Sequence, residues 1–350
     1  MLLKRLSEAF GPSGLEGEVR NILTEELAPF VNEWMRDALG NLIAVKPGTR
    51  GPKVMLAAHM DECGLMISSI DRSGLLRFRK VGGLDDRVLV SKYVVIGPKK
   101  IPGVIGAKAI HLQRPEERTQ VIPLSGLYID IGAKNKEDAE RLIKLGDYAV
   151  FGTEFAHLSD TVVKGKAFDD RAGCAVLAEV LKEQYSMPIY GAFTVQEEIG
   201  LRGAGVAAYA IEPDLAIVLE GTTCSDLPGS LEHGFCTGMG EGPAITTMDA
   251  SVITDKRMVN ELLRLAKENH IPVQFKRSIT GGSDAGRINQ TKAGTPVVVI
   301  SVPCRYIHSP VSMLNLVDFE NTIKLVKLNQ VDRCAGLRFL ESIDKGGFAL

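Results

Sequence analysis

The sequence predicts an α/β fold in which a parallel or mixed sheet, covered by helices on both faces, is interrupted by an inserted β-rich domain. After Lys164, helix-like and strand-like segments alternate, a pattern typical of such a sheet. Between residues 68 and 159 the chain instead has short β-branched runs separated by Gly and Pro, as in a small barrel or sandwich. We therefore assign residues 1–67 and 160–350 to the α/β domain and residues 68–159 to the insert.

The segment before the insert is predicted to open with a helix and to continue into the sheet. One helix is expected within residues 1–30, capped by Ser13 or Gly14, because apolar residues recur at helical spacing from Leu15 to Leu27. The stretch EWMRDALGNLIAVKPG alternates like a strand pair around a turn at Gly40. KVMLAAHMDECGLMISSI is mostly apolar, as in a central strand that is buried on both faces.

The insert is predicted to be mostly β-strand, and the segment after it to supply the remaining strands and helices of the α/β domain. Within the insert itself, only KNKEDAERLIKLG has a helical pattern. Beyond it, helices are expected in DDRAGCAVLAEVLKEQ, GLRGAGVAAYAI and RMVNELLRLAKENH and from about Asn315, and strands in IYGAFTVQEE, DLAIVLEG and TPVVVISVP.

Composition and charge exclude several classes of function. The 350 residues are 45% hydrophobic and 24% charged, and a net charge of -2 gives no reason to expect nucleic-acid binding. The first residues do not resemble a secretory signal, and no apolar run is long enough to cross a bilayer, so a cytoplasmic protein without a membrane partner is expected. The six cysteines contain no C-x-x-C pair and are predicted to be reduced and mostly buried.

Polar side chains stand where several apolar runs end, which breaks the hydrophobic pattern of each run. Carboxylates are almost never fully buried unless they are paired or bound to metal. Because ligands of open α/β sheets bind beyond the carboxyl ends of the strands, these residues are expected to share one site. Their types indicate a hydrolase with two metal ions. They are His59 and Asp61 after VMLAA, Asp169 and Asp170 in KAFDDRAG, Glu197 and Glu198 after GAFTVQ, Glu220 after LAIVL, and His308 after VVVISVPCRYI.

The spacing suggests a division of roles within this set. His59 and Asp61 project to the same side of a strand, and a carboxylate commonly orients a metal-bound imidazole. Glu197 and Glu198 face opposite ways, which fits one metal ligand and one general base. Two divalent ions would balance three carboxylate ligands and one hydroxide. Each residue also has an interpretation without metal. His59 could simply end a strand, Asp169 and Asp170 could cap a helix, and Glu197 and Glu198 could be solvated.

Taken together, HMDECG, KAFDDRAG, QEEIGLRGA, LEGT and RYIHSP resemble the M42 family of metallo-aminopeptidases over nearly the whole chain. The resemblance implies a zinc-exopeptidase-like sheet domain. It also implies two divalent ions, with zinc preferred and cobalt or manganese as alternatives. By the family pattern, His59 and Glu220 bind one ion, Glu198 and His308 bind the other, Asp169 bridges them, Glu197 is the general base and Asp61 orients His59. Asp170 is left with a helix-cap or supporting role.

The same resemblance implies the reaction and the assembly. Members remove the N-terminal residue of short peptides with a water activated between the two ions. They assemble as tetrahedral dodecamers built from dimers, and the insert resembles their dimerisation domain. Acidic, basic and aliphatic N-terminal residues are each preferred by some members, and the sequence does not decide among them. LEGT carries Glu220 where the family often has Asp, so the coordination mode of Glu220 stays open.

Three other functions compete with this interpretation, besides the endoglucanase label that some relatives carry. Gly203-x-Gly205-x-x-Ala208 followed by Glu220 imitates a dinucleotide-binding fingerprint, but Glu197 and Glu198 would then face the pyrophosphate. GGSDAG suggests a serine nucleophile, yet Ala285 stands where the second Gly of that motif belongs, so a loop at a helix start is expected. A non-catalytic scaffold would leave the acids solvated. An endoglucanase would leave His59 and His308 without a role.

Overall fold

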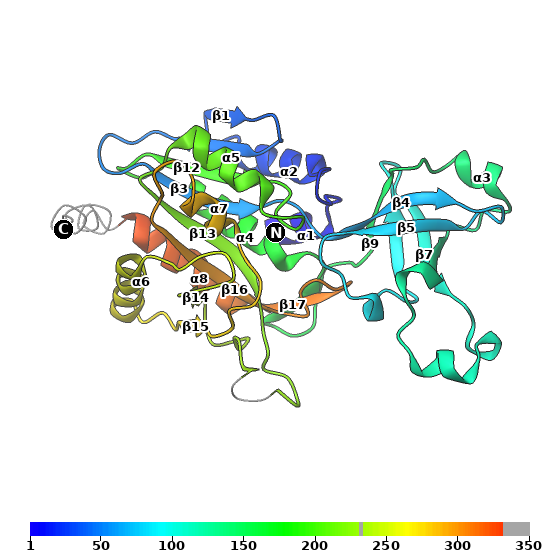
Figure 1. Cartoon of the computed structure of the whole chain (residues 1–350). Helices are drawn as coiled ribbons and strands as arrows, with labels where there is room; N and C mark the ends of the chain where they lie inside the picture. The colour runs from blue at the N-terminus through cyan, green and yellow to red at the C-terminus, as the bar shows by residue number, and fades with distance from the viewer. Residues whose placement is uncertain (231–233, 332–350) are drawn as a thin grey trace.

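The computed structural model describes residues 1–230 and 234–331 and consists of a large mixed sheet with helices on both faces and a separate closed barrel. The sheet has 11 strands, and its main path runs β1-β2-β12-β3-β13-β16-β17-β11-β10. Figure 1 shows the barrel projecting from one side of the sheet domain. The predicted fold class, an α/β sheet with a β-rich barrel, is therefore confirmed.

The sheet is built from segments on both sides of the barrel. The N-terminal elements are α1 (Leu2–Glu8), α2 (Gly17–Leu27), β1 (Glu33–Arg36), β2 (Leu42–Lys46) and β3 (Val54–His59). The elements from residue 156 to residue 223 are β10 (Ala156–His157), β11 (Val162–Gly165), α4 (Phe168–Leu181), β12 (Ile189–Thr194), α5 (Arg202–Ile211) and β13 (Leu215–Thr223). The last elements are β14 (Ala244–Thr246), α6 (Lys256–Glu268), β15 (Gln274–Lys276), α7 (Asp284–Asn289), β16 (Val297–Arg305), β17 (Ser312–Asn315) and α8 (Leu316–Val331).

Four parallel strands, β12, β3, β13 and β16, form the centre of the sheet. Their mostly apolar sequences are buried on both faces. One face packs against α1, α2, α4, α6 and α8, and the other packs against α5 and α7. Because these strands run in the same direction, their carboxyl ends lie at one edge, where the predicted site residues occur.

The barrel closes on itself and has its own hydrophobic core. Its strand order is β4-β5-β8-β7-β6-β9. The predicted boundaries of the insert, residues 68–159, stay a prediction. The barrel elements are β4 (Gly64–Ile70), β5 (Leu76–Val81), η1 (Asp86–Val88), β6 (Tyr93–Ile96), β7 (Ile101–Ala107), η2 (Ile110–Leu112), η3 (Pro115–Thr119), η4 (Leu124–Gly126), β8 (Leu127–Asp130), α3 (Lys136–Glu140) and β9 (Tyr148–Phe151).

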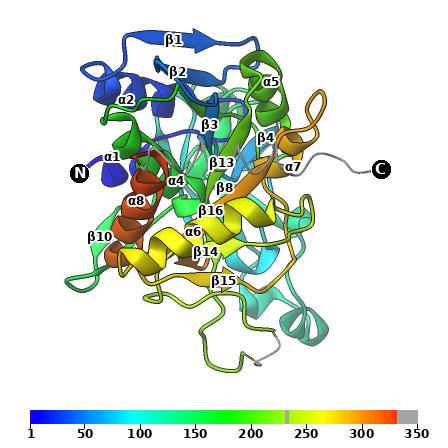
Figure 2. The ribbon, with the colours of Figure 1, turned by 90° about the vertical axis from the view of Figure 1, so that its left-hand side faces the viewer.

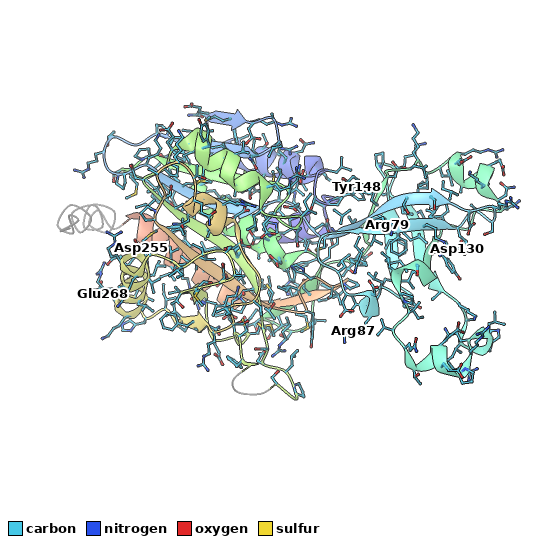
Figure 3. All side chains as sticks on the ribbon, in the orientation of Figure 1. Arg79, Arg87, Asp130, Tyr148, Asp255 and Glu268 are labelled. Atoms are coloured by element: carbon cyan, nitrogen blue, oxygen red, sulfur yellow. The ribbon has the colours of Figure 1, made fainter. Side chains whose placement is uncertain are left out.

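Local signals explain several element boundaries. Asp255 caps α6 by accepting from the amide of Arg257, and Figure 3 shows Asp255 and Glu268 beside α6, on the opposite side of the molecule from Arg79 and Asp130 of the barrel. The single helix expected within residues 1–30 is instead two helices, α1 and α2. The predicted cap at Ser13 or Gly14 is wrong, because Glu16 precedes α2 and the Ser13 hydroxyl donates to Asp61.

The structure also places most of the cysteines and allows a search for membrane-spanning helices. Cys63, Cys174, Cys224, Cys236 and Cys304 are buried and free, while Cys334 lies outside the described residues. Across residues 1–230 and 234–331, no helix combines the length and apolar character that a membrane span requires.

A buried ionic cluster fastens the N-terminal segment to α4. The Lys166 ammonium lies 2.6 and 2.7 Å from the two carboxylate oxygens of Glu62, and the Arg171 guanidinium lies 3.1 Å from one of them. Arg171 also donates to the backbone oxygens of Leu6 and Gly11. Burial and the nearby Arg171 charge lower the pKa of Lys166 to about 8, although Glu62 opposes the shift. One carboxylate therefore pairs with two buried cations, and backbone carbonyl oxygens also accept from both side chains.

We expect Glu62→Gln to destabilise the fold strongly. The amide would leave Lys166 and Arg171 buried without their anion, which typically costs about 3–5 kcal/mol. Urea unfolding followed by the fluorescence of Trp34, the single tryptophan, measures the change. Glu179→Gln, which breaks a partly exposed pair with Lys182, is the control and should cost about 1 kcal/mol or less. Equal losses in both variants would contradict a special role for Glu62.

Candidate metal centre

The residues predicted from the sequence converge at the carboxyl edge of the four parallel strands. His59 ends β3, Glu220 lies in the last part of β13, Glu197 and Glu198 follow β12, and His308 follows β16. All of them except His59 line a cavity of about 540 Å³, and the buried His59 lies beside Asp169, which lines the same cavity. The lining includes Asp169, Glu197, Glu198, Glu220 and His308.

Asp169 lies between the two histidines and offers a different oxygen to each. Its Oδ1 is 3.3 Å from Nε2 of His59, and its Oδ2 is 3.4 Å from Nε2 of His308. Nε2 of His59 is also 3.7 Å from Oε2 of Glu220, and Nε2 of His308 is 3.5 Å from Oε2 of Glu198. Two adjacent groups of potential ligands therefore share one carboxylate.

Close backbone packing holds Asp169 and His308 in place. Gly221 of β13 touches Asp169, since a Cβ added to Gly221 would lie 2.8 Å from the Asp169 Cα. A larger residue would push Asp169 away from the sheet. On the other side, Nδ1 of His308 is 2.9 Å from the carbonyl oxygen of Gly83, which belongs to the loop after β5. This bond orients the His308 ring, so that Nε2 faces the acids.

Asp61 contacts His59, which it was predicted to orient, and it also accepts hydrogen bonds from three other residues. Its Oδ1 is 3.4 Å from Nδ1 of His59, but its carboxylate also accepts from the Ser13 hydroxyl at 2.6 Å. The backbone amides of Glu197 and Glu198 donate to it at 3.0 and 3.2 Å. Burial raises the pKa of Asp61, but the bonds from His59, Ser13 and the Glu197 amide bring it below its ordinary value. Asp61 thus joins the end of β3 to the loop after β12.

Burial and mutual repulsion raise the pKa values of three acids in the cavity. Burial, with the charges of Glu220 and Asp284, raises the pKa of Glu197 to about 10 despite the nearby His59. Burial also raises the pKa of Glu198 to about 7 and that of Glu220 well above its usual range. Burial opposes protonation of His308, yet Asp169 and Glu198 raise its pKa to about 10. Crowded negative charge in a buried site therefore favours the protonated forms of these acids and of His308, whereas the two imidazoles lower the pKa of Asp169.

The donor atoms fit divalent cations. Within each of the two groups, His59 with Asp169 and Glu220, and Cys63 with Glu198 and His308, one donor atom per residue lies within 4.8 Å of the others. Oε1 of Glu220 is buried and has no hydrogen-bond partner among the described residues. Imidazole and carboxylate ligands at such spacing suit zinc, cobalt or manganese.

Three residues beside the site were not predicted to belong to it. The Cys63 sulfur lies 3.9 Å from Nδ1 of His308. Asp284, the first residue of α7, accepts from the Thr194 hydroxyl at 2.5 Å, and burial raises its pKa to about 6. Cys63 and Asp284 lie inside the HMDECG and GGSDAG motifs, but only the folded chain brings them to the acids. Lys276 lines the far wall of the cavity, and no motif marked it.

Asp170 combines the two roles considered for it. Its carboxylate accepts from the amide of Gly173 at 2.9 Å, as a helix cap does, and from the amide of His59 at 3.1 Å. Both contacts use its oxygens inside the protein, and Asp170 does not line the cavity. Asp169 alone of the pair faces it.

Comparison with known proteins identifies the family. The family model described as M42 glutamyl aminopeptidase matches residues 40–325. The chain belongs to the M42 peptidase family. A curated relative from Acetivibrio thermocellus is 44% identical over 329 residues, covering 93% of this chain and 96% of its own. The crystal structure of a TET aminopeptidase from a marine sediment archaeon (Thaumarchaeota archaeon SCGC AB-539-E09) is 39% identical with a TM-score of 0.93, covering 97% of this chain and 98% of its own.

Other relatives of this M42 peptidase carry names that refer to different substrates. A lysyl aminopeptidase of Pyrococcus furiosus is 33% identical and a glutamyl aminopeptidase of Lactococcus lactis is 34% identical, each alignment covering at least 91% of both chains. A Thermotoga maritima structure called endoglucanase is 36% identical with a TM-score of 0.80, covering 96% of this chain and 98% of its own. The TET1 peptidase of Pyrococcus horikoshii, solved as a dodecamer, is 36% identical with a TM-score of 0.84, covering 95% and 98%.

The rival motifs have structural explanations in this M42 peptidase. Gly203 lets α5 approach β12 closely, since an added Cβ would lie 2.4 Å from Oδ1 of Asn41 and 2.5 Å from the carbonyl oxygen of Val195. The glycine therefore serves packing rather than pyrophosphate binding. Ser283 precedes α7, as expected for a loop at a helix start, and its hydroxyl donates to Asp249 at 2.9 Å. No histidine accepts from that hydroxyl within residues 1–230 and 234–331.

We expect Asp61→Asn to weaken divalent-cation binding by about 10- to 100-fold, the usual effect of altering a residue that supports metal ligands. The amide cannot accept from both Glu197 and Glu198 amides while also facing His59. Competitive titration against a chelator measures the affinity. Ser13→Ala removes one donor to Asp61 and should have a smaller effect. Wild-type affinity in the Asn variant would refute the supporting role.

Proposed function

We propose that this M42 peptidase is an aminopeptidase that uses two divalent cations to remove the N-terminal residue of short peptides. His59 and Glu220 would hold one cation, Glu198 and His308 the other, and Asp169 would bridge them. The main support is the position of Asp169, whose two oxygens lie 3.3 and 3.4 Å from the two histidines. The unpartnered Glu220 oxygen and the raised pKa values of Glu198 and Glu220 also fit a site for cations.

The bound cations would supply Lewis acidity, making water more acidic and polarising the peptide carbonyl. Glu197 borders the cavity, and its Oε2 is 3.9 Å from Nε2 of His59. Its carboxylate receives no side-chain hydrogen bond from the described part of the chain, whereas its backbone amide donates to Asp61. Glu197 is therefore free to take a proton from water and to return it to the leaving amine.

The endoglucanase alternative has weaker support. Glycoside hydrolysis needs two carboxyl groups that flank a sugar bond, and it needs no imidazoles between them. Here Nε2 of each histidine lies within 3.7 Å of two carboxylates. The clustered donors favour cation binding. A cytoplasmic location for this enzyme stays a prediction.

We propose that the barrel mediates assembly into a homo-oligomer, a dodecamer built from dimers. The barrel exposes several large apolar side chains, and exposed apolar surface commonly marks protein interfaces. They are Tyr93, Val104, Ile110, Leu112 and Val121. A dodecameric relative with 36% identity supports the same assembly.

Glu197→Gln is expected to lower kcat by about 100- to 10,000-fold, because the amide cannot carry the proton. Its metal content, measured by elemental analysis, should stay at the wild-type value. Glu198→Gln is the matched variant and should instead lose metal, since its oxygen would be a ligand. The opposite pattern would mean that the two adjacent glutamates exchange roles. Full activity in Glu197→Gln would contradict the general-base assignment.

Val104→Asp tests the assembly role without disturbing the site. Deleting the barrel would remove the Gly83 carbonyl that contacts His308, so a point variant is cleaner. Val104 is 47% exposed, and a charge there should yield smaller particles in light scattering. Val206→Asp on α5, at a valine that is 40% exposed, is the control and should keep the wild-type size. An unchanged assembly in Val104→Asp would place the interface elsewhere.

A further inference from the structure

The cavity extends from the candidate cation ligands to a wall that is rich in hydroxyl groups and contains a lysine. Lys276 is the single lysine or arginine among the lining residues, all of which belong to the described part of the chain. Few aliphatic side chains accompany it, namely Leu201, Val299 and Ile307. The hydroxyl residues are Thr222, Thr223, Thr280, Ser283 and Ser301. This wall is suited to a polar substrate group.

The sheet register explains why Lys276 faces the cavity. Lys276 of β15 pairs with Thr246 of β14, which in turn pairs with Val299 of β16. Side chains of directly paired residues lie on the same face of a sheet. Val299 lines the cavity and is two residues before Ser301, the cross-strand neighbour of Glu220. Lys276 therefore projects on the same sheet face as Glu220.

The distance along the sheet suits the side chain of a bound N-terminal residue. β15 is three strands away from β13, the strand that carries Glu220, and neighbouring strands are about 4.8 Å apart. The two backbones are therefore separated by about 14 Å, and the side chains of Lys276 and Glu220 shorten this gap from both ends. The intervening cavity can hold one amino-acid side chain.

The charge of Lys276 is available to a ligand. Within residues 1–230 and 234–331, the Lys276 ammonium forms no ion pair and no cation–π contact. The guanidinium of the adjacent Arg277, by contrast, lies over the ring of Phe235. Lys276 is half-buried, so part of its charge is already removed from solvent. A buried or half-buried cation binds a carboxylate more strongly than an exposed one.

Asp249, the other charged residue of the wall, is already satisfied. Its Oδ1 accepts from the Ser251 amide and hydroxyl and from the Val252 amide at 2.7 to 2.9 Å. Its Oδ2 accepts from the Ser283 hydroxyl at 2.9 Å. A basic substrate side chain would therefore find few free lone pairs on Asp249 and would be repelled by Lys276.

We propose that Lys276 is a specificity-determining residue that selects peptides with an acidic N-terminal side chain, glutamate or aspartate. This inference rests on the proposed aminopeptidase function and adds the substrate class. The names of relatives do not decide the class, since both lysyl and glutamyl enzymes match this chain at similar identity. In this enzyme the Lys276 ammonium binds the side-chain carboxylate, and the neighbouring hydroxyl groups donate to its remaining lone pairs.

The test compares kcat/KM for the p-nitroanilides of Glu, Gln, Leu and Lys, using the metal-loaded enzyme. Gln is nearly isosteric with Glu, so the Glu to Gln ratio isolates the charge. The wild type is expected to prefer Glu. Lys276→Met should lower kcat/KM for Glu by about 10- to 100-fold, the value of one hydrogen bond between charged groups, with little change for Leu and Gln. Lys276→Glu should shift the preference toward Lys.

Lys256→Met, at an exposed lysine that begins α6, is the matched control and should behave like the wild type. A wild-type preference for Lys or Leu, or an unchanged Glu to Gln ratio in Lys276→Met, would overturn the proposal. If no substrate is cleaved, the proposed function fails, and calorimetry then tests the site independently. Wild type should bind L-glutamate more tightly than L-glutamine, and equal binding of the two would overturn the role of Lys276.

Discussion

Burial of several carboxylates at one edge of a parallel sheet is the constraint on which the rest of the site depends. Each buried acid must find donors, and the structure divides the acids by where those donors come from. Asp61 and Asp170 use backbone amides, and Asp284 uses the Thr194 hydroxyl. These acids hold the segments of the site together. Asp249 of the cavity wall is satisfied in the same way. The other acids that line the cavity, Asp169, Glu197, Glu198 and Glu220, receive no such bonds within the described residues, which leaves them for ligands.

The two parts of the fold both contribute to this arrangement. The sheet domain supplies every candidate ligand, but the barrel loop supplies the Gly83 carbonyl that orients His308. An added Cβ at Gly82 would lie 2.7 Å from the Cys63 sulfur, so this loop packs closely over the site. On the opposite side, Glu62 joins α4 to the N-terminal segment through Lys166 and Arg171. The candidate ligands are therefore held from two directions, by the barrel and by the N-terminal segment.

Much of this could be predicted from the sequence, because the strongest signals are local. The long apolar runs that end at His59, Glu220 and near His308 form central parallel strands, and parallel strands bring their carboxyl ends together. Short strands such as β14 and β15, with three residues each, have no periodicity to detect. The break between α1 and α2 was missed for a different reason, since Ser13 resembles a helix cap but bonds to Asp61, far along the chain. Local patterns do not encode such long-range partners.

The contrast between long central strands and short outer strands also separates the proposed catalytic residues from the proposed specificity residue. The residues proposed for catalysis lie at the ends of central strands, where packing on both faces restricts change. Lys276 lies on β15, an edge strand that pairs only with β14 in the described structure. A substitution there alters the cavity wall without repacking the core, because an edge side chain has fewer neighbours. An edge position next to the proposed catalytic centre would therefore allow a change in the residue that is removed without a change in the fold.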